Sequence, residues 1–344
     1  MGNALNNTQK TYKNRTRSAT LEDVAKEAGL SPMTVSRALN NPKVVRPATI
    51  SRVMDAVNIT GYIPNMLAGG LATSRTKLIA VVVPQINNNM FVDTVQAISD
   101  ELALRGYHML LCIVGYEPEA ETDIVATLLS RRPDGIVLTG IHHTSELKRI
   151  ILNANIPVVE IWDLTPTPID MLIGFSHEKV GNAIGAYFLD KGFTRFGFIC
   201  ASDRRAVVRK KGAQAVLRTR PEHEIEELIV SRPANMEVGR NALRQMMADG
   251  KRFDAIICSS DTLAQGAIME AEAQGLRVPG DLSVIGFADL NFAAHNRPAI
   301  TTVSVDKWEL GVKAARMLAD KIEGIPVAES VVDLGYSLVI RESA

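Results

Sequence analysis

The feature that most constrains the fold is a regular alternation of short β-branched runs and amphipathic helical stretches that begins at Leu78. Its first cycle reads LIAVVVP, then MFVDTVQAISDELALRG, then YHMLLCIVG. Alternation at this spacing is typical of βαβ units, in which helices cover both faces of a mostly parallel sheet. The later strand candidates are GIVLTG, PVVEIW, LIGFS, RFGFICA, ELIVS, AIICSS, LSVIGF and LGYSLVI. This part of the chain is therefore predicted to be an α/β module.

The number of strand candidates favours two lobes over one sheet. About ten strands are too many for one small sheet, and we expect residues 174–177 to cross between two lobes. We place residues 78–176 and 305–328 in the first lobe, and residues 177–304 and 329–344 in the second. Ligands bind beyond the carboxyl ends of parallel strands, so a cleft between two such lobes is the expected ligand site.

The amino-terminal segment predicts a separate, all-α domain. TLEDVAKEAG indicates a helix with Thr20 as its N-cap and Gly29 as its left-handed end. SPMTVSRALNN indicates a second helix, with Ser31 as its cap and Pro32 in the first helical position. So short a turn between two helices predicts a helix-turn-helix, to which ISRVMDAVNITG adds a third helix; an αα-hairpin without a DNA role is the alternative. The residues expected to face the common core are Val24, Ala25, Ala28, Leu30, Val35, Leu39, Ile50, Val53, Met54 and Val57.

Charge is unevenly distributed along the chain, although the formal net charge is zero. Residues 1–77 hold 11 of the 38 basic and 4 of the 38 acidic residues, which leaves 27 basic and 34 acidic residues for the remainder. A basic head of +7 is thus joined to an acidic body of −7. This asymmetry indicates a polyanionic partner for the head alone, with a solvated basic face as the alternative.

Cysteine usage and the absence of targeting signals indicate a cytoplasmic protein. Cys112, Cys200 and Cys258 each lie in an apolar run, and none has a second cysteine at metal-ligand or redox spacing. We expect them to be reduced, buried thiols. The first twenty residues are polar and basic without an apolar signal core, and no run approaches membrane-spanning length. No membrane partner is expected.

The segment TLEDVAKEAGLSPMTVSRALNN, followed by GYIPNMLAGGLATSRT and the α/β module, resembles the lactose-repressor (LacI-type) family of bacterial regulators. The resemblance runs from about Thr20 to Arg341. MTVSR, GYIPN, VVVPQINNNMF, IPVVEIWD and VVDLGYSLVI are most similar to the gluconate-utilisation repressors. The resemblance implies four segments along the chain. Residues 1–19 form a flexible basic arm, residues 20–62 a helix-turn-helix DNA-binding domain, and residues 63–77 a hinge helix or linker. Residues 78–344 form a two-lobed, periplasmic-binding-protein-like effector and dimerisation domain.

The resemblance also implies which residues contact operator DNA. The second helix of a family helix-turn-helix lies in the major groove, so Arg37 is the first candidate for a guanine, whose O6 and N7 its guanidinium can bond together. Pro32 and Met33 have no side-chain donor and would read shape or a thymine methyl group. Leu71 stands at the position of the hinge leucine that wedges into the minor groove. The other DNA-binding candidates, suited mainly to phosphates or to capping, are Thr20, Leu21, Ser31, Thr34, Ser36, Asn40 and Asn65.

An effector site between the lobes is the second implication. Arg209 matches a family arginine that bonds ligand oxygens, and Ala288 stands where the family usually has an acid. Loss of an acid beside a retained arginine favours an anionic sugar acid such as gluconate over a neutral sugar. A surface role for Arg209 is the alternative. The effector candidates are Asn88, Met90, Phe91, His142, Trp162, Arg209, Ser260, Asp261 and Asp289.

These expectations combine into a homodimeric repressor that binds a pseudo-palindromic operator and changes the angle between its lobes when effector binds. The chain ends within a few residues of LGYSLVI, without room for a heptad tail, which favours a dimer over a tail-assembled tetramer. Walker, GxGxxG, HExxH and GxSxG motifs are absent, so we expect no enzyme, metal site or cofactor. The alternatives are a sugar-binding receptor without DNA function and an α/β enzyme.

Overall fold

A computed structural model describes residues 18–63, 75–87 and 89–344. The chain divides into two compact units, with the boundary between Thr76 and Lys77. The first unit contains the all-α segment and the second contains the α/β module. Among the described residues, no helix combines the length and the apolar character that crossing a membrane requires.

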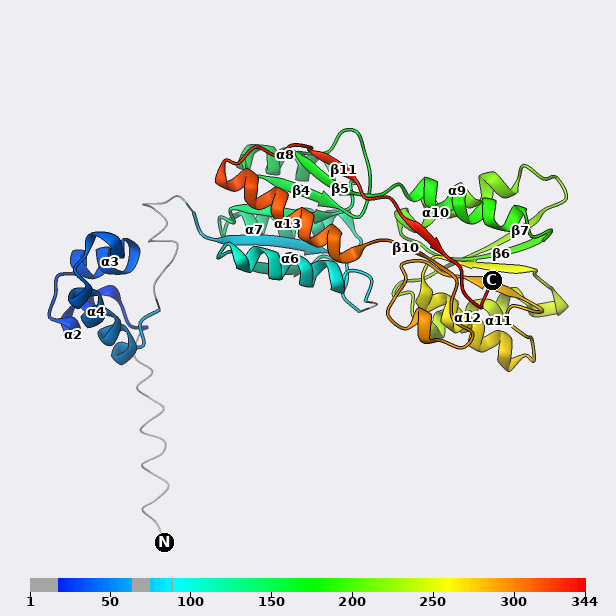
Figure 1. The fold of residues 1–344 in the computed structure, drawn as a ribbon, viewed down its shortest axis with the longest axis horizontal. Coiled ribbons are helices and arrows are strands. Elements are labelled where there is room, and N and C mark those ends of the chain that lie inside the picture. The colour runs from blue at the N-terminus through cyan, green and yellow to red at the C-terminus, as the bar shows by residue number, and fades with distance from the viewer. Residues whose placement is uncertain (1–17, 64–74, 88) are drawn as a thin grey trace, which may run out of the picture. The chain divides into compact units, whose positions relative to one another are not determined.

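Three α-helices build the described part of the first unit (Figure 1). The Thr20 side chain and Asp23 form a capping box at the start of the first helix, and Gly29 ends that helix with a φ of 60°. Ser31 caps the second helix, with Pro32 in its first turn. The helix-turn-helix prediction is therefore confirmed, although the third helix begins at Pro47 rather than Ile50. The elements are α2 (Leu21–Ala28), α3 (Pro32–Asn40), η1 (Pro42–Val44) and α4 (Pro47–Thr60).

The core of this unit is small and largely as predicted. Its buried side chains are Val24, Ala25, Ala28, Val35, Ala38, Val53 and Ala56, with Leu30, Leu39 and Val57 packed against them. The prediction for Met54 is wrong, because that side chain is 46% exposed. The buried stripe of α4 contains Val53 and Ala56, which are three residues apart, and Met54 points away from it.

Two parallel sheets in the second unit confirm the α/β prediction. The first sheet has the strand order β11-β5-β4-β3-β1-β2 and the second has the order β7-β6-β8-β9, while β10 and β12 form an antiparallel pair. Strands of the first sheet are β1 (Leu78–Val83), β2 (His108–Ile113), β3 (Gly135–Thr139), β4 (Val158–Ile161), β5 (Met171–Gly174) and β11 (Val331–Asp333). Those of the second are β6 (Arg195–Ala201), β7 (Glu224–Val230), β8 (Ala255–Cys258) and β9 (Ser283–Ile285), and the pair consists of β10 (Thr302–Ser304) and β12 (Ser337–Val339).

Helices cover both faces of each sheet, as Figure 1 shows. In β1, Ile79 and Val81 belong to the core under α6 and α13, whereas Ala80 and Val82 belong to the core under α7 and α8. This two-sided burial explains why the strand reads as a continuous apolar run. The helices are α6 (Val92–Leu104), α7 (Pro118–Leu129), α8 (Ser145–Ala154), α9 (His177–Leu189), α10 (Arg204–Leu217), α11 (Met236–Met246), α12 (Asp261–Ala273) and α13 (Lys307–Glu323), with η2 (Ala248–Gly250) and η3 (Ala293–His295).

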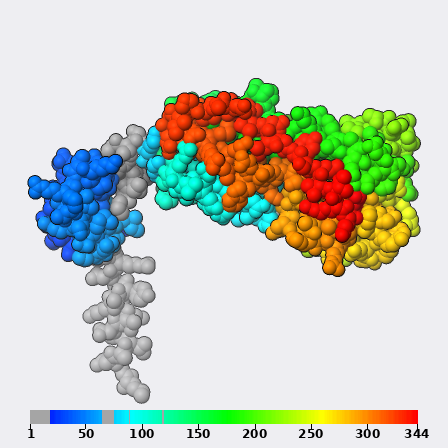
Figure 2. Space-filling view, in the orientation of Figure 1, coloured from blue at the N-terminus to red at the C-terminus, as the bar shows by residue number. Residues whose placement is uncertain are grey.

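The last strands correct the expected division into lobes. Residues 331–333 form β11 and pair in parallel with β5 in the first sheet, so assigning the whole of residues 329–344 to the second lobe is wrong. The Leu334 amide still donates to the Gly174 carbonyl, 2.8 Å away, and only then does the chain continue to β12. This carboxy-terminal segment lies on the surface of the second unit (Figure 2).

Candidate functional site

Helix α3 exposes a row of polar side chains on the first unit. Arg37 is exposed, and no described carboxylate lies within ion-pair distance of it. Met33 is 65% exposed, so an apolar side chain stands beside this cation on the surface. Met33 lies in the first turn of α3 and Arg37 one turn later, and an exposed guanidinium with an apolar group beside it is suited to base edges in a major groove.

Other DNA-contact candidates in this unit also have structural partners. The Thr20 hydroxyl donates to the Asp23 carboxylate over 2.8 Å, and Ser31 accepts from the Thr34 amide over 3.2 Å. Leu21 packs against the small core. The Asn40 amide donates to the Ser36 hydroxyl over 3.3 Å. Two further DNA-contact candidates, Asn65 and Leu71, lie outside the described residues, as does the effector candidate Asn88 of the second unit.

The second unit contains a cavity, partly open to solvent, between its two lobes. The first lobe contributes side chains from the loops that follow its strands, and the second lobe contributes most of the charged groups. Four of the predicted effector residues line it: Met90, Trp162, Arg209 and Ser260. The remaining lining residues are Gln85, Tyr116, His177, Ala201, Asp203, Arg205, Arg232, Ala234, Ser259 and Phe287.

Arg209 is a buried cation at the wall of this cavity. Its guanidinium donates to His177 Nδ1 and to the Ser259 carbonyl, each over 2.9 Å, and lies 3.6 Å from the centroid of the Phe287 ring. No described carboxylate lies within ion-pair distance of it. Burial lowers its pKa to about 10, so it remains charged at neutral pH. Asp203 and Asp163 favour its charge from beyond that distance, so the guanidinium has no directly bonded counter-ion, and an anionic ligand would offset the cost of its burial.

Aromatic rings form the first-lobe side of the cavity. Trp162 packs edge-on against Phe91, with ring centroids 5.1 Å apart, and against Phe175 at 5.9 Å. Its indole N–H donates to Thr94 Oγ1 over 3.2 Å, which fixes the ring. Phe91 is 1% exposed and lies behind Trp162. Phe91 is not among the residues that line the cavity, so its interpretation as a lining residue is wrong: its ring packs against Trp162 and supports the wall.

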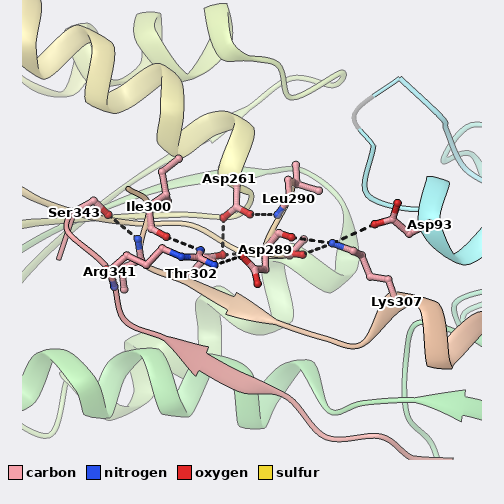
Figure 3. Close-up of polar contacts among 11 residues, drawn as sticks. Asp93, Asp261, Asp289, Leu290, Ile300, Thr302, Lys307, Arg341 and Ser343 are labelled. Atoms are coloured by element: carbon pink, nitrogen blue, oxygen red, sulfur yellow. Dashed lines mark hydrogen bonds and ion pairs between the residues drawn. The ribbon is translucent and has the colours of Figure 1, made fainter. Parts of the chain in front are cut away.

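Asp261 and Asp289 were expected at the effector site but are engaged elsewhere. Asp261 is fully buried at the start of α12 and accepts hydrogen bonds from the Thr302 hydroxyl and the Leu290 amide (Figure 3). Burial raises its pKa to about 6. Asp289 pairs with Arg341 over 2.8 Å. Neither lines the cavity, because both carboxylates bind residues near the strands that cross between the lobes.

Lys307 of the first lobe contacts the loop at residues 288–289 of the second lobe. Its ammonium group donates to the carbonyls of Ala288 and Asp289, each over 2.9 Å, and lies 3.6 Å from the Asp93 carboxylate (Figure 3). Ala288 and Asp289 both have positive φ values, 99° and 48°. The loop where the family usually has an acid therefore serves here as a backbone acceptor for a first-lobe lysine.

His142 also lies outside the cavity lining, but its neighbour His143 forms a buried ionic cluster. The His143 ring lies 2.9 Å from Glu121 through Nδ1 and 3.4 Å from Glu160 through Nε2. Burial opposes its charge, yet the hydrogen bonds to both carboxylates raise the pKa of His143 to about 9. His143 is thus a buried cation that has its own counter-ions.

Sequence reasoning missed several cavity residues. Arg232 stacks on the Tyr116 ring at 4.3 Å and pairs with Glu117 at 3.3 Å. Arg205 reaches the first lobe, where its guanidinium lies 5.4 Å from the Phe91 centroid. Asp203 caps α10 directly after β6. Ligands bind beyond the carboxyl ends of parallel strands. Asp203 and Arg205 could have been predicted on this ground, because SDRR directly follows the strand run RFGFICA.

Comparisons with known proteins agree with both units. Residues 20–65 match the family described as bacterial regulatory proteins, lacI family, and residues 186–344 match a periplasmic binding protein-like domain. The HTH-type transcriptional regulator GntR of Pseudomonas aeruginosa is 32% identical over 94% of this chain and 95% of its own.

Solved structures show the same likeness over both units. A LacI-family transcriptional regulator from Silicibacter pomeroyi has a TM-score of 0.89 and 30% identity over 94% of this chain and 99% of its own. A lac repressor dimer, bound to operator and the anti-inducer ONPF, has a TM-score of 0.79 and 26% identity over 95% of this chain and 99% of its own. The relatives named here are regulators, in agreement with the prediction that the chain is not an enzyme.

Proposed function

Because the chain belongs to the lacI family of bacterial regulatory proteins and is a DNA-binding transcription regulator, we propose that it is a homodimeric repressor controlled by a sugar acid such as gluconate. The observation that carries the effector class is Arg209, a buried guanidinium that faces the interlobe cavity without a described carboxylate partner. A ligand carboxylate would supply the missing counter-charge through a charge-assisted, bidentate contact.

The rest of the cavity suits a polyhydroxylated acid. Trp162 and Tyr116 offer ring surfaces to an apolar sugar face. Gln85, Ser260 and Asp203 carry amide, hydroxyl and carboxylate groups that suit sugar hydroxyls. The likeness to gluconate-utilisation repressors in VVVPQINNNMF and IPVVEIWD supports the same class of effector.

The proposal for DNA rests on helix α3. Arg37 is its base-reading residue, and Met33 and Pro32 are the apolar groups beside it. A dimer would place two copies of α3 in successive major grooves of a pseudo-palindromic operator. The lac repressor dimer bound to operator, at a TM-score of 0.79, supports this arrangement. The protein would then act in the cytoplasm, where its operator lies.

Control would pass between the two ligands as a coupling free energy. A sugar acid that binds one arrangement of the lobes better than the other shifts the population of the DNA-binding form. A hundredfold change in operator affinity needs only about 2.7 kcal/mol of such differential binding.

Calorimetry tests the effector class directly. Wild-type protein is titrated with gluconate, glucose and a phosphorylated sugar, and Arg209→Ala is titrated in parallel. We expect gluconate to bind more tightly than glucose, and the variant to lose about tenfold to a hundredfold in gluconate affinity. A wild-type preference for glucose, or equal losses for all three ligands, would reject the anion site. Operator titration with and without gluconate then measures the sign of the coupling.

A further inference from the structure

His177 lies where the two lobes and the cavity meet. It is the first residue of α9, directly after the crossing from β5, and is 3% exposed. Its Nε2 is 2.9 Å from the Trp162 carbonyl oxygen, and its Nδ1 is 2.9 Å from Nη1 of Arg209. One imidazole therefore bonds the first-lobe wall on one side and the buried cation of the second lobe on the other.

The partners of this ring determine its protonation. A guanidinium can only donate, so Nδ1 must accept its hydrogen bond and cannot carry a proton. Nε2 then carries the hydrogen and donates to the Trp162 carbonyl. The ring is neutral, in agreement with the low pKa that burial and the nearby Arg209 and Arg205 side chains impose on His177. The packing rings of Phe175 and Phe287 add no charge.

Close helix packing brings His177 onto Arg209. A Cβ at Gly181 of α9 would lie 2.0 Å from the Arg209 carbonyl oxygen, and one at Gly212 of α10 would lie 2.6 Å from the Glu178 carbonyl. Only glycine fits at either position without moving backbone. The two helices can therefore approach until the first residue of α9 reaches the guanidinium on α10.

The first-lobe partner is fixed as well. Trp162 has a φ of 66°, a conformation that is unusual and costly for a bulky residue. Two hydrogen bonds hold the residue in this conformation: its backbone carbonyl accepts from His177 and its indole N–H donates to Thr94. The acceptor for His177 is thus part of a rigid wall.

We propose that His177 is the positioning residue of the effector site: it orients the Arg209 guanidinium toward the cavity and ties that guanidinium to the first lobe through the Trp162 carbonyl. This inference rests on the proposed function, since Arg209 is the assigned contact for the effector acid. Binding of an anion at Arg209 and the arrangement of the lobes then depend on the same two hydrogen bonds. Selectivity for an acid over a neutral sugar depends on them too.

The first test compares two replacements at His177 by calorimetry with gluconate and glucose. His177→Leu removes both hydrogen bonds, and we expect at least a tenfold loss for gluconate with less than a threefold loss for glucose. His177→Gln keeps an acceptor and a donor, and we expect it to recover most of the lost gluconate affinity. His108→Leu, at an exposed position in β2, is the matched control. Gluconate affinity of His177→Leu within threefold of wild type would overturn the proposal.

A second test needs no effector. Nitrogen NMR of the imidazole rings in the full-length protein should show His177 as the neutral tautomer with hydrogen on Nε2 from pH 8 down to pH 5.5. In Arg209→Met, the Nδ1 signal should shift, because its hydrogen bond is lost. A ring that titrates near pH 6.5, or one unaffected by Arg209→Met, would refute the positioning role. If wild type binds no sugar acid, the proposed effector fails, while this experiment still decides the role of His177.

Discussion

Each of the two lobes contains a buried cation, and the two cations differ in whether the fold supplies carboxylate partners. His143 in the first lobe is enclosed by two carboxylates, Glu121 and Glu160. Arg209 in the second lobe is bonded to a neutral imidazole and a carbonyl, with no described carboxylate at ion-pair distance. A buried charge whose partners are supplied by the fold serves stability, whereas one that lacks a counter-ion is available to a ligand. Under the proposed function, the comparison is between a structural cation, His143, and a proposed binding cation, Arg209.

The largest effect is expected when the structural cation is removed. His143→Leu leaves Glu121 and Glu160 buried without their cation, which should lower the free energy of unfolding by about 3–5 kcal/mol. Denaturant titration followed by circular dichroism measures the loss. Adding Glu160→Gln to this variant should restore part of the stability, because it removes one of the unpaired charges. A loss below about 1 kcal/mol would show that the ionic cluster of His143, Glu121 and Glu160 contributes little to stability.

The pH dependence of stability gives a second test of the structural role of His143. The pKa of His143 is about 9 in the folded protein and about 6.5 when unfolded. A raised histidine pKa stabilises fully below pH 6.5, and this stabilisation is lost as pH rises through 9. Between these values the contribution should fall by about 1.4 kcal/mol per pH unit, or about 3 kcal/mol in total. The difference between wild type and His143→Gln, measured by urea titration at each pH, isolates this slope; parallel curves would contradict it.

Replacing Arg209, the proposed binding cation, should impair ligand binding more than stability. Arg209→Met should weaken gluconate binding by about 1.5–3 kcal/mol. It should change the free energy of unfolding by less than about 1 kcal/mol, because the two hydrogen bonds that are lost are offset by replacing a buried charge that has no directly bonded counter-ion with an apolar side chain of similar length. Calorimetry and thermal unfolding provide the two readouts. Lys211→Met, exposed on the same helix, is the control. Severe destabilisation with unchanged gluconate affinity would reverse the comparison.

An exposed cation extends the comparison to the first unit. Arg37→Ala should leave stability nearly unchanged and weaken operator binding by about 1–3 kcal/mol, with relaxed preference at one base pair. Gel-shift titration on the operator and on single-base variants gives both numbers. Lys43→Ala, exposed in η1, should weaken all sequences alike if it contacts DNA at all. Loss of affinity without loss of base preference would make Arg37 a phosphate contact.

Local signals in the sequence were sufficient for most of the fold. Thr20, Gly29 and Ser31 act within one helical turn of their own backbone, so their caps could be predicted from neighbours alone. The strand runs that are buried on both faces were equally clear. Strands β10 and β11 were missed because they are short and lie outside the apolar runs recognised in the sequence, whereas the equally short β9 and β12 lie within LSVIGF and LGYSLVI. Met54 was misplaced because helical spacing alone does not distinguish its face of α4 from the adjacent buried one.

The candidate site was harder to predict because its contacts join distant residues. Asp261 was carried over by position, but its partner Thr302 lies 41 residues later and directs the carboxylate away from the cavity. His177 was seen only as part of a crossing, since nothing near it in the sequence indicates an arginine 32 residues away. Position in a family motif predicts which loop a residue occupies, whereas side-chain direction depends on the packed partner.

The placement of β11 has a consequence for biosynthesis. This strand completes the sheet that begins at Leu78, yet it consists of residues 331–333. A ribosome must therefore translate as far as residue 333 before the first sheet can be completed, whereas residues 18–63 are available to fold much earlier. The nascent chain therefore contains all of its three-helix unit long before it contains all strands of the first lobe. A chain that terminates before residue 331 would lack this strand, and the damage would fall on the lobe that is made first.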